Sequence, residues 1–475
     1  MLPQAKYVAI GIKKPIYMRI TQHMVLNDII QQYQQLEQAL AQLSRSARFD
    51  PGVNLRLERI THLLQVLGNP HHHFPAIHIG GTSGKGTTAA MAAAILTAAG
   101  YRTGLYLSPA LQILNECYQL NGQICATSRL SALFATMKPA LDAVAATNPA
   151  GSPTPFEAQV ALAFLLFQRE GVDVAVVEVG LGGARDATNV LPATVAVLTN
   201  VGLDHTAILG DTVAAIAQEK AGIIKPGRHV ISGVEQPEAR RIIADRCAAQ
   251  GARLWQVGPD ITWQPEATGK FTLHLPTRTL TKLSSGMPGA AHIANAACAV
   301  AAVEALPGFV LPEQALRHGL ATARLPGRLE IVQEAPTVLL DGAHNPDKLR
   351  AALQLIDTTY ADKRRILVPA LKADKDAHAL LPPLLERADQ VIVTAFRAKH
   401  LWEPLSPLSL ADLAAMYAPH LDIRVVADPL EAIALTLDIA TPADLVWVTG
   451  SLYLVGDVRE HWYPAAMLLE QAELG

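Results

Sequence analysis

A glycine-rich loop between an apolar run and an alanine-rich stretch constrains the fold of this chain more than any other feature. Residues 76–80 read Ala-Ile-His-Ile-Gly, the loop continues as Gly-Thr-Ser-Gly-Lys-Gly, and Thr87 opens a helix predicted over residues 87–99. Glycines let backbone N–H groups surround phosphate oxygens, the helix N-terminus and Lys85 add positive charge, and a hydroxyl can bind Mg²⁺. The stretch predicts a nucleotide-phosphate site in an α/β fold.

This loop departs from the standard Walker pattern at two positions. Ile79 stands where that pattern has its first glycine, and Gly86 separates Lys85 from the hydroxyl of Thr87. A purely structural junction between a strand and a helix is the alternative interpretation. The lysine, the threonine and the helix stand in register, which favours the phosphate site.

Length and charge limit the classes of protein that remain. The 475 residues predict two or three domains, and the formal net charge of −3 argues against nucleic-acid binding. Four scattered cysteines without a CxxC pair are typical of reduced thiols in a cytoplasmic protein. No stretch approaches ~18 uninterrupted apolar residues, so no membrane span is predicted.

Strand and helix patterns alternate along the chain and restart once. Residues 26–325 predict a P-loop-type nucleotide-binding domain with a mostly parallel sheet, in which ligands bind beyond the carboxyl ends of the strands. Residues 1–25 are a possible N-terminal extension, and residues 254–285 predict a small antiparallel addition. Residues 326–475 predict a second, Rossmann-like α/β domain, with strands near 337–340, 365–369, 390–394, 423–426 and 445–449.

Polar side chains follow several predicted strands of the first domain. Glu178 ends an apolar strand, where a carboxylate is costly unless it is paired, hydrogen-bonded to backbone or bound to a metal. Asp204 and His205 follow the next strand. The imidazole of His205 and a carboxylate at a neighbouring strand end could share a cation with the hydroxyl of Ser108 or Thr87. A hydrogen-bonded structural histidine is the alternative for His205, and the nearby phosphate loop favours the cation site.

Other polar residues keep two interpretations open. Lys220, in a mostly apolar helix, is either a snorkelling side chain or a lysine of lowered pKa that is open to modification. His71–His73 predict a solvated turn rather than a metal site, because adjacent imidazoles rarely converge on one ion. In the second domain, Asp341–Pro346 and Gly450-Ser451 end two strands and are expected to face the cleft between the domains.

Together the motifs identify a family. They are Gly81–Thr87, Leu107–Pro109, Phe156-Glu157, Glu178–Gly183, Asp186–Asn189, Leu203–Thr206, Lys220–Ile223, Pro326–Arg328, Asp341–Pro346 and Gly450–Tyr453. In this order, over roughly residues 26–465, the chain closely resembles the folylpolyglutamate synthases, including their bifunctional dihydrofolate synthase members, within the Mur-ligase superfamily. Gly86 is informative, because cell-wall Mur ligases usually have Thr or Ser directly after the lysine.

The resemblance implies an ATP-dependent amide ligase. ATP would phosphorylate a folate carboxylate, and the amine of L-glutamate would attack the acyl phosphate to give an amide, ADP and phosphate. The expected partners are small molecules, namely a folate or dihydropteroate, L-glutamate, and ATP with two Mg²⁺ ions. The protein is expected to be a cytoplasmic monomer.

The resemblance also implies site residues. Those for ATP are Ser83, Gly84, Lys85, Gly86, Asn295, Arg328 and Asp341. Those for Mg²⁺ are Thr87, Ser108, Glu178, His205 and a carbamylated Lys220. Those for the folate are Thr154, Pro155, Phe156, Glu157, Arg185, Asp186 and Ala187. The expected catalytic residues are Lys85, Lys220, Asp186 and His344, of which His344 would face the γ-phosphate or the glutamate.

Several positions depart from the family pattern. Ser83 stands where asparagine is frequent, Ala110 where histidine is, and His292 where glutamine is. Cys117 and Ala184 each stand where arginine is frequent. Most of these changes fall in loops on the substrate side, so they bear on which folate is used. Two alternatives remain, namely a Mur-type ligase for another carboxylate acceptor and an ATP-binding protein that has lost its chemistry.

Overall fold

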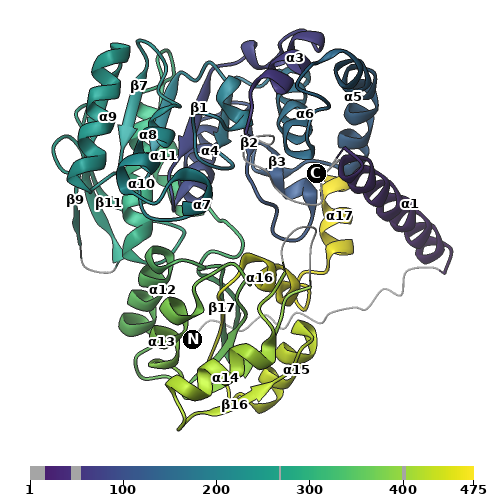
Figure 1. Cartoon of the computed structure of the whole chain (residues 1–475), viewed down its shortest axis with the longest axis vertical. Coiled ribbons are helices and arrows are strands. Elements are labelled where there is room, and N and C mark those ends of the chain that lie inside the picture. Colours follow the sequence, from purple (N-terminus) through teal and green to yellow (C-terminus); the bar gives the residue numbers. More distant parts are fainter. Residues whose placement is uncertain (1–15, 44–54, 267–268, 398–402) are drawn as a thin grey trace, which may run out of the picture.

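The chain folds into two α/β domains that follow one another along the long axis of the molecule (Figure 1). This computed structural model describes residues 16–43, 55–266, 269–397 and 403–475. Within these residues, one domain holds an eight-stranded sheet and the other a six-stranded sheet, and helices cover both. The predicted fold class is confirmed, whereas the boundary between residues 325 and 326 stays a prediction.

The first sheet is parallel through its centre and has antiparallel strands at one edge. In spatial order its strands are β4 (Gln123–Ile124), β3 (Tyr118–Leu120), β2 (Thr103–Tyr106), β5 (Val174–Glu178), β1 (Ala76–Gly80), β6 (Val195–Leu198), β7 (His229–Ser232) and β8 (Arg253–Gln256). The central strands are fully buried, which explains their near-continuous apolar sequence. Because β1 lies between β5 and β6 in parallel register, the carboxyl ends of all three adjoin.

Helices cover both faces of this sheet. They are α3 (Glu58–Val66), α4 (Lys85–Ala98), α5 (Thr127–Thr147), α6 (Pro155–Arg169), α8 (Val213–Ala221), α9 (Pro237–Gln250), α10 (Ala290–Glu304) and α11 (Glu313–Thr322). Val174 and Val176 pack with α4 and α10 on one face, while Ala175 and Val177 pack with α6 on the other. Alternate side chains of β5 therefore pack into two separate hydrophobic cores, one on each face of the sheet.

A small antiparallel sheet lies beside the first sheet. It consists of β9 (Thr262–Pro265), β10 (Phe271–His274) and β11 (Thr279–Leu283). Phe271 and Leu273 of this sheet join the core formed by α4 and α10. The predicted antiparallel addition is confirmed for these strands, but it was wrong to include β8, which pairs in parallel with β7 in the main sheet.

The second sheet forms the centre of the other domain. In spatial order it contains β12 (Glu330–Glu334), β13 (Thr337–Asp341), β17 (Leu445–Thr449), β14 (Arg365–Pro369), β15 (Gln390–Val393) and β16 (Asp422–Val425). Its helices are α12 (Pro346–Thr359), α13 (Ala377–Leu385), α14 (Pro407–Tyr417), α15 (Pro429–Ile439) and α16 (Leu452–Arg459). All predicted strands form in parallel, whereas the antiparallel edge strand β12 was not predicted.

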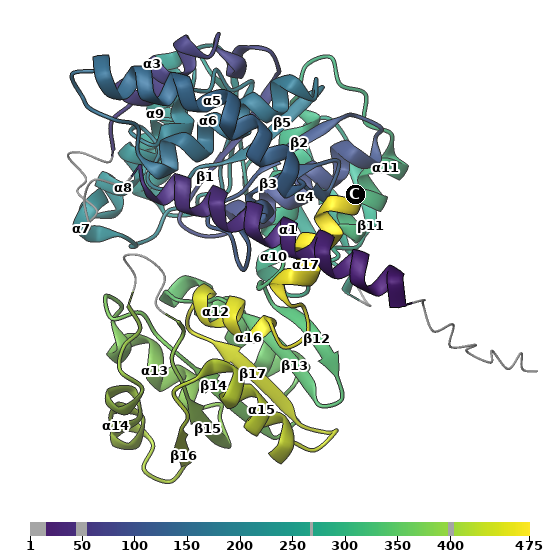
Figure 2. The same ribbon diagram turned by 90° about the vertical axis from the view of Figure 1, so that its right-hand side faces the viewer.

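The last helix returns to the first domain. Figure 2 shows α17 (Ala465–Leu474) against α1 (Ile16–Ala41) and near α5. Ser128 donates its backbone N–H and its hydroxyl to the carboxylate of Glu473, which fixes the end of α17. The helix α1 begins ten residues before the start predicted at residue 26, and residues 16–25 of the predicted extension are helical. The rest of that predicted extension lies outside the described residues.

The histidine run forms a turn, as predicted, but one of its rings is buried. Residues Pro70–His72 make a short 3₁₀ helix, and His71 stacks on Phe164 with ring centroids 5.9 Å apart. Burial, with the neighbouring His72, lowers the pKa of His71 to about 4. Among the described helices, none combines the length and the apolar character needed to cross a membrane.

Candidate active site

The loop between β1 and α4 is held by residues that directly follow β6. Asn200 Oδ1 accepts hydrogen bonds from the backbone N–H groups of Thr82 and Ser83, at 3.0 and 2.7 Å. Thr199 Oγ1 donates to the Ser83 carbonyl at 2.6 Å. With the loop fixed in this way, the N–H groups in the first turn of α4 are left for an anion. Sequence reasoning missed both anchors, although they lie at the end of a strand predicted over residues 194–200.

Gly84 allows α10 to approach this loop closely. It precedes α4 in the left-handed region, at φ +81°, which favours glycine. A Cβ atom at this position would lie 2.2 Å from Asn295 Oδ1, which comes from α10. Two of the predicted ATP-binding residues are therefore neighbours, and a larger residue at Gly84 would displace Asn295.

Two cavities meet beside the phosphate loop. The larger, of about 380 Å³, is lined by residues of both domains, including the predicted Ser83, Gly84, Lys85, Gly86, Thr87, Glu178, Asn295, Arg328 and Asp341. The smaller, of about 80 Å³, is lined by Ser108, Glu116, Gln119 and Leu452 among others. Both linings contain Gly86, Glu178 and Arg328. These three residues therefore stand at the junction of the two cavities.

Two buried polar atoms at this junction lack a hydrogen-bond partner within the part of the chain that the structure describes. Glu178 Oε2 accepts the backbone N–H of Ser108 at 3.2 Å. Burial raises the pKa of Glu178, while the cations of Lys85 and Arg328 oppose that rise. Ser108 Oγ and Arg328 Nη1 are buried without a hydrogen-bond partner among the described residues. Because such atoms are costly to leave unsatisfied, the junction fits a polar, anionic ligand with its cation.

The donors present suit Mg²⁺ bound with phosphates rather than a closed protein cage. Among the described residues, no three His, Cys, Asp or Glu side chains are arranged to hold a metal. Magnesium commonly uses one or two carboxylates together with substrate phosphates and water. Thr87 and Glu178 line the larger cavity and Ser108 the smaller, whereas His205 is 38% exposed and lines neither.

Lys220 lies directly behind the phosphate loop. Its Nζ donates to the Gly81 carbonyl at 2.9 Å. Burial, and next the nearby charge of Lys85, lowers the pKa of Lys220 to about 7. Lys220 is therefore a buried lysine of lowered pKa, the second of the two interpretations left open by the sequence, and not a snorkelling side chain.

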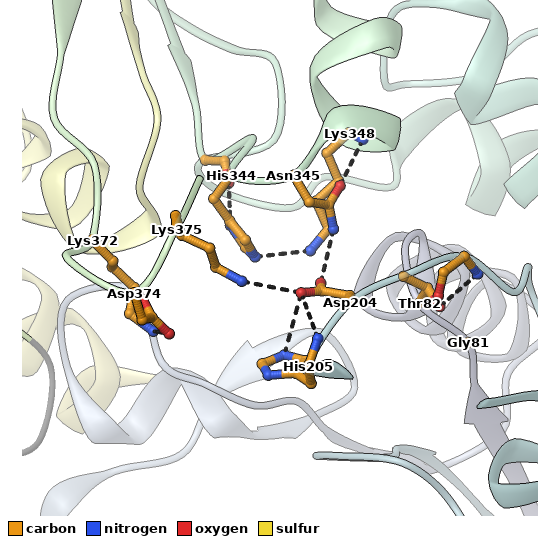
Figure 3. Close-up of polar contacts among 12 residues, drawn as sticks. Gly81, Thr82, Asp204, His205, His344, Asn345, Lys348, Lys372, Asp374 and Lys375 are labelled. Carbon is orange, nitrogen blue, oxygen red and sulfur yellow. Dashed lines mark hydrogen bonds and ion pairs between the residues drawn. The ribbon is translucent and has the colours of Figure 1, made fainter. Parts of the chain in front are cut away.

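A polar cluster joins the two domains (Figure 3). Asp204, from the loop after β6, accepts Asn345 Nδ2 at 2.8 Å and Lys375 Nζ at 3.0 Å, both from the second domain. Burial raises the pKa of Asp204, but His205, Lys375 and Lys348 together hold it well below its usual range. Sequence reasoning missed the two lysines. Lys375 follows the carboxyl end of β14, which is the only signal that would have found it.

His344 and Asp341 are both engaged within the second domain. His344 Nδ1 lies 2.8 Å from the Gly342 carbonyl, and its Nε2 lies 3.0 Å from Lys348 Nζ. Burial, with the charge of Lys348, holds the pKa of His344 well below its usual value. Asp341 accepts the backbone N–H groups of Leu329 and Ala343, and burial raises its pKa to about 6.

The residues predicted to contact a folate line neither cavity. Thr154 caps α6, and Glu157 accepts the Thr154 backbone N–H at 2.6 Å. Both Glu157 oxygens also accept hydrogen bonds from Arg59, and the two side chains are 1% and 2% exposed. Glu157 therefore supports the start of α6 and faces Arg59 instead of a ligand space.

Asp186 and Arg185 also make their contacts with neighbouring protein groups. Asp186 accepts the backbone N–H groups of Leu181 and Thr188, at 2.7 and 2.9 Å, and is buried. Arg185 pairs with Glu219 on the surface, at 3.3 Å. These hydrogen bonds show that Asp186 stabilises the conformation of the loop after β5. Its contact with a folate stays a prediction.

Two domain families match the chain. The Mur ligase middle domain matches residues 79–303, and the Mur ligase glutamate ligase domain matches residues 327–452. The "Dihydrofolate synthase/folylpolyglutamate synthase" of Bacillus subtilis is 33% identical over 86% of this chain and 95% of that protein. The "Folylpolyglutamate synthase" of Lacticaseibacillus casei is 34% identical over 85% and 93%.

Solved structures share the whole architecture. The Escherichia coli FolC in complex with DHPP and ADP has a TM-score of 0.80 and 31% identity, covering 90% of this chain and 97% of that one. The Mycobacterium tuberculosis folylpolyglutamate synthase complexed with ADP has a TM-score of 0.83 and 31% identity, covering 91% and 99%. A bifunctional folylpolyglutamate synthase/dihydrofolate synthase with Mn, AMPPNP and L-glutamate bound has a TM-score of 0.74 and 32% identity, covering 86% of this chain and 94% of that one. With its phosphate loop, its two Mur ligase domains and these relatives, the chain belongs to the folylpolyglutamate synthase/dihydrofolate synthase family.

Proposed function

We propose that this chain is an ATP-dependent ligase that joins L-glutamate to the carboxylate of a folate. The observation that carries the proposal is the pair of cavities that meet at Gly86, Glu178 and Arg328. The larger contains the phosphate loop, so it suits the nucleotide, and the smaller suits the carboxylate that receives the phosphoryl group. The family relatives, which are named for this reaction, support the same activity.

The reaction has two steps that balance without a redox partner. A carboxylate oxygen attacks the γ-phosphorus of ATP and ADP leaves, which gives an acyl phosphate. The amine of L-glutamate then attacks the acyl carbon, loses a proton and expels inorganic phosphate. Activation is needed because a carboxylate would otherwise have to expel oxide. Lys85 and Arg328 offset the negative charge as two anions come together.

Magnesium, when bound, would neutralise phosphate charge at the junction of the cavities. We propose Thr87, Ser108 and Glu178 as its protein ligands, supported by the lining of the two cavities and by the unpartnered hydroxyl of Ser108. His205 remains a proposed ligand by its position in the family motif. It would have to turn inward from its half-exposed setting beside Asp204.

Lys220 is proposed to react with CO₂ and form a carbamate, which would give the site a further anionic ligand. A neutral amine is the form that attacks CO₂, and the lowered pKa of Lys220 supplies that form near neutral pH. Intact-mass analysis or ¹³C NMR in ¹³C-bicarbonate should reveal one added carboxyl group. If the wild type and Lys220→Arg show the same spectrum at saturating bicarbonate, the carbamate must be abandoned.

The folate is proposed to reach the smaller cavity along the loop that contains Arg185, Asp186 and Ala187 and the start of α6 at Thr154, Pro155 and Phe156. Support comes from their position in the family motifs, while their contacts show a shaping role. Direct contact of Asp186 with the pterin would therefore need a rearrangement of the hydrogen bonds that it makes to Leu181 and Thr188. A substrate panel that includes dihydropteroate would show which acceptors this surface admits.

The decisive measurement is phosphate release with ATP, Mg²⁺, L-glutamate and tetrahydrofolate, with dihydropteroate in a parallel arm. Release is expected only when the acceptor and glutamate are both present. Phosphate release that ignores glutamate would rule out the ligase, and a preference for another carboxylate would indicate a different Mur-type acceptor.

Lys85→Ala is predicted to reduce this turnover at least ~100-fold, because a phosphate-facing cation worth roughly 3 kcal/mol is removed. The variant should remain folded, since Lys85 opens α4 and its side chain lines the cavity. The melting temperature is the control. Turnover close to that of the wild type would contradict the role given to the phosphate loop.

A further inference from the structure

Lys348 is a cation in the cavity that no carboxylate neutralises. It is the third residue of α12, and it lines the larger cavity with Lys85 and Arg328. Among the described residues, no carboxylate lies within ion-pair distance of its Nζ. The acidic residue that acts on it, Asp204, is already bound by Lys375 and Asn345.

In the described part of the chain, the one hydrogen-bond partner of the Lys348 ammonium is the ring of His344, and the geometry fixes the tautomer of that ring. Gly342 offers only a carbonyl oxygen to His344 Nδ1, at 2.8 Å, so Nδ1 must carry the hydrogen. Nε2 is then an acceptor, and Lys348 Nζ, at 3.0 Å, donates to it. The imidazole thus aims the lysine, and two N–H donors of the ammonium remain for another group.

The electrostatic setting of Lys348 is unfavourable without an anion. A positive charge in the first turn of a helix opposes the helix dipole. Burial, and then the charges of Arg328 and Lys85, lower the pKa of Lys348 to about 7, with Asp204 acting in the opposite sense and Lys375 in the same sense. An anion bound in the cavity would stabilise the charged form of Lys348 against the helix dipole, its burial and the neighbouring cations.

We propose that Lys348 binds the terminal phosphoryl group of the nucleotide, across the cavity from Lys85, and that His344 positions it. This inference rests on the proposed function. The shared cavity favours a phosphoryl oxygen over a carboxylate of the incoming glutamate, since its lining includes the whole phosphate loop from Thr82 to Thr87. Lys348 is carried by the second domain, so this contact forms across the domain interface.

The test is calorimetric binding of Mg²⁺–AMPPNP and Mg²⁺–ADP, which needs no turnover. Lys348→Met should weaken AMPPNP binding about tenfold or more, as expected for the loss of a charge-assisted hydrogen bond, and change ADP binding less than about twofold. Lys348→Gln should do the same, and His344→Gln should give an intermediate loss. Lys138→Met is the matched control, because Lys138 is an exposed lysine of α5 paired with Asp142.

Each other outcome overturns the assignment in its own way. Unchanged AMPPNP affinity in both Lys348 variants, with melting temperatures like that of the wild type, would exclude the contact. Equal weakening of ADP and AMPPNP would exclude the terminal phosphoryl group, and a raised KM for glutamate alone would assign Lys348 to the amino acid. If the wild type binds neither nucleotide, the proposed function itself fails.

Discussion

At the scale of single residues, the site is built from polar and charged groups whose hydrogen-bonding capacity the described residues do not satisfy. Within that part of the chain, Arg328 Nη1 and Ser108 Oγ are buried without a hydrogen-bond partner, and Lys348 donates to a neutral imidazole. Each such group destabilises the folded chain by itself. Bound reactants would satisfy these groups. The same groups that lower the stability of the ligand-free protein would therefore strengthen ligand binding.

The ligand-free stability should therefore depend on pH through Lys348. Its folded pKa, about 7, lies below the ~10.4 of an unfolded lysine, so between these values the unfolded chain binds more protons. This group's contribution to the unfolding free energy thus rises with pH across the window. Lys348→Met removes the penalty, so the variant should be more stable than the wild type at pH 7 and below. That advantage should shrink towards pH 10, in denaturant titrations of both proteins, with Lys138→Met as the control.

The buried pair of Arg59 and Glu157 should behave in the opposite way. Removing one partner leaves a buried charge uncompensated, so Glu157→Gln or Arg59→Met should cost roughly 3–5 kcal/mol of unfolding free energy. The double variant Arg59→Met/Glu157→Gln should lose less than the sum of these two single changes. Additive losses in chemical denaturation would show that the two side chains act independently.

At the scale of elements, the loop after β5 and the helix α8 pack without space for a side chain. A Cβ atom at Gly222 would lie 2.3 Å from the Cβ of Ala184, and one at Gly183 would lie 2.7 Å from the Glu219 carbonyl. The Ala184 that replaces the arginine frequent in the family thus meets the end of α8. This contact fixes Lys220, which binds the phosphate loop from the same helix.

Gly222→Ala should therefore act at a distance. Overpacking of this kind costs about 1–3 kcal/mol, and the shift of α8 should move Lys220 away from Gly81. We expect weaker AMPPNP binding together with a lower melting temperature. Gly227→Ala is a suitable control for the loss of a glycine, since nothing lies within 4 Å of its Cβ position, although its positive φ adds strain. Equal nucleotide affinity in the two variants would contradict the coupling.

The sequence predicted most strands because parallel, doubly covered strands leave long apolar runs, as in β5. It missed β12, whose Glu-Ile-Val-Gln-Glu sequence lies at an exposed edge, and α5, which contains Pro139. Glu178 and Arg328 could be predicted as site residues because one ends a strand and the other lies in a family motif. Both line the junction of the two cavities. Lys348 and Lys375 escaped notice because their role depends on how the second domain sits against Asp204, which no local pattern encodes.

At the scale of the whole molecule, Asp204 is the polar link between the phosphate-loop domain and the start of α12. Asp204→Ala should release Asn345 and Lys375, and amide hydrogen exchange should become faster over residues 345–350 and 375–380. Exchange in β1 and β13 should stay slow. Asp245→Ala, an exposed change in α9, is the control. Identical exchange in the first turn of α12 would show that the link does not hold the domains.

The return of α17 to the first domain has a mechanical consequence. The chain crosses between the domains once at residues 323–329 and again between α16 and α17, whose Leu468 and Leu469 pack with Ile29 and Tyr33 of α1. Two connections restrict the movement of the second domain against the first more than a single connection would. The position of Lys348 relative to the phosphate loop is restricted with it.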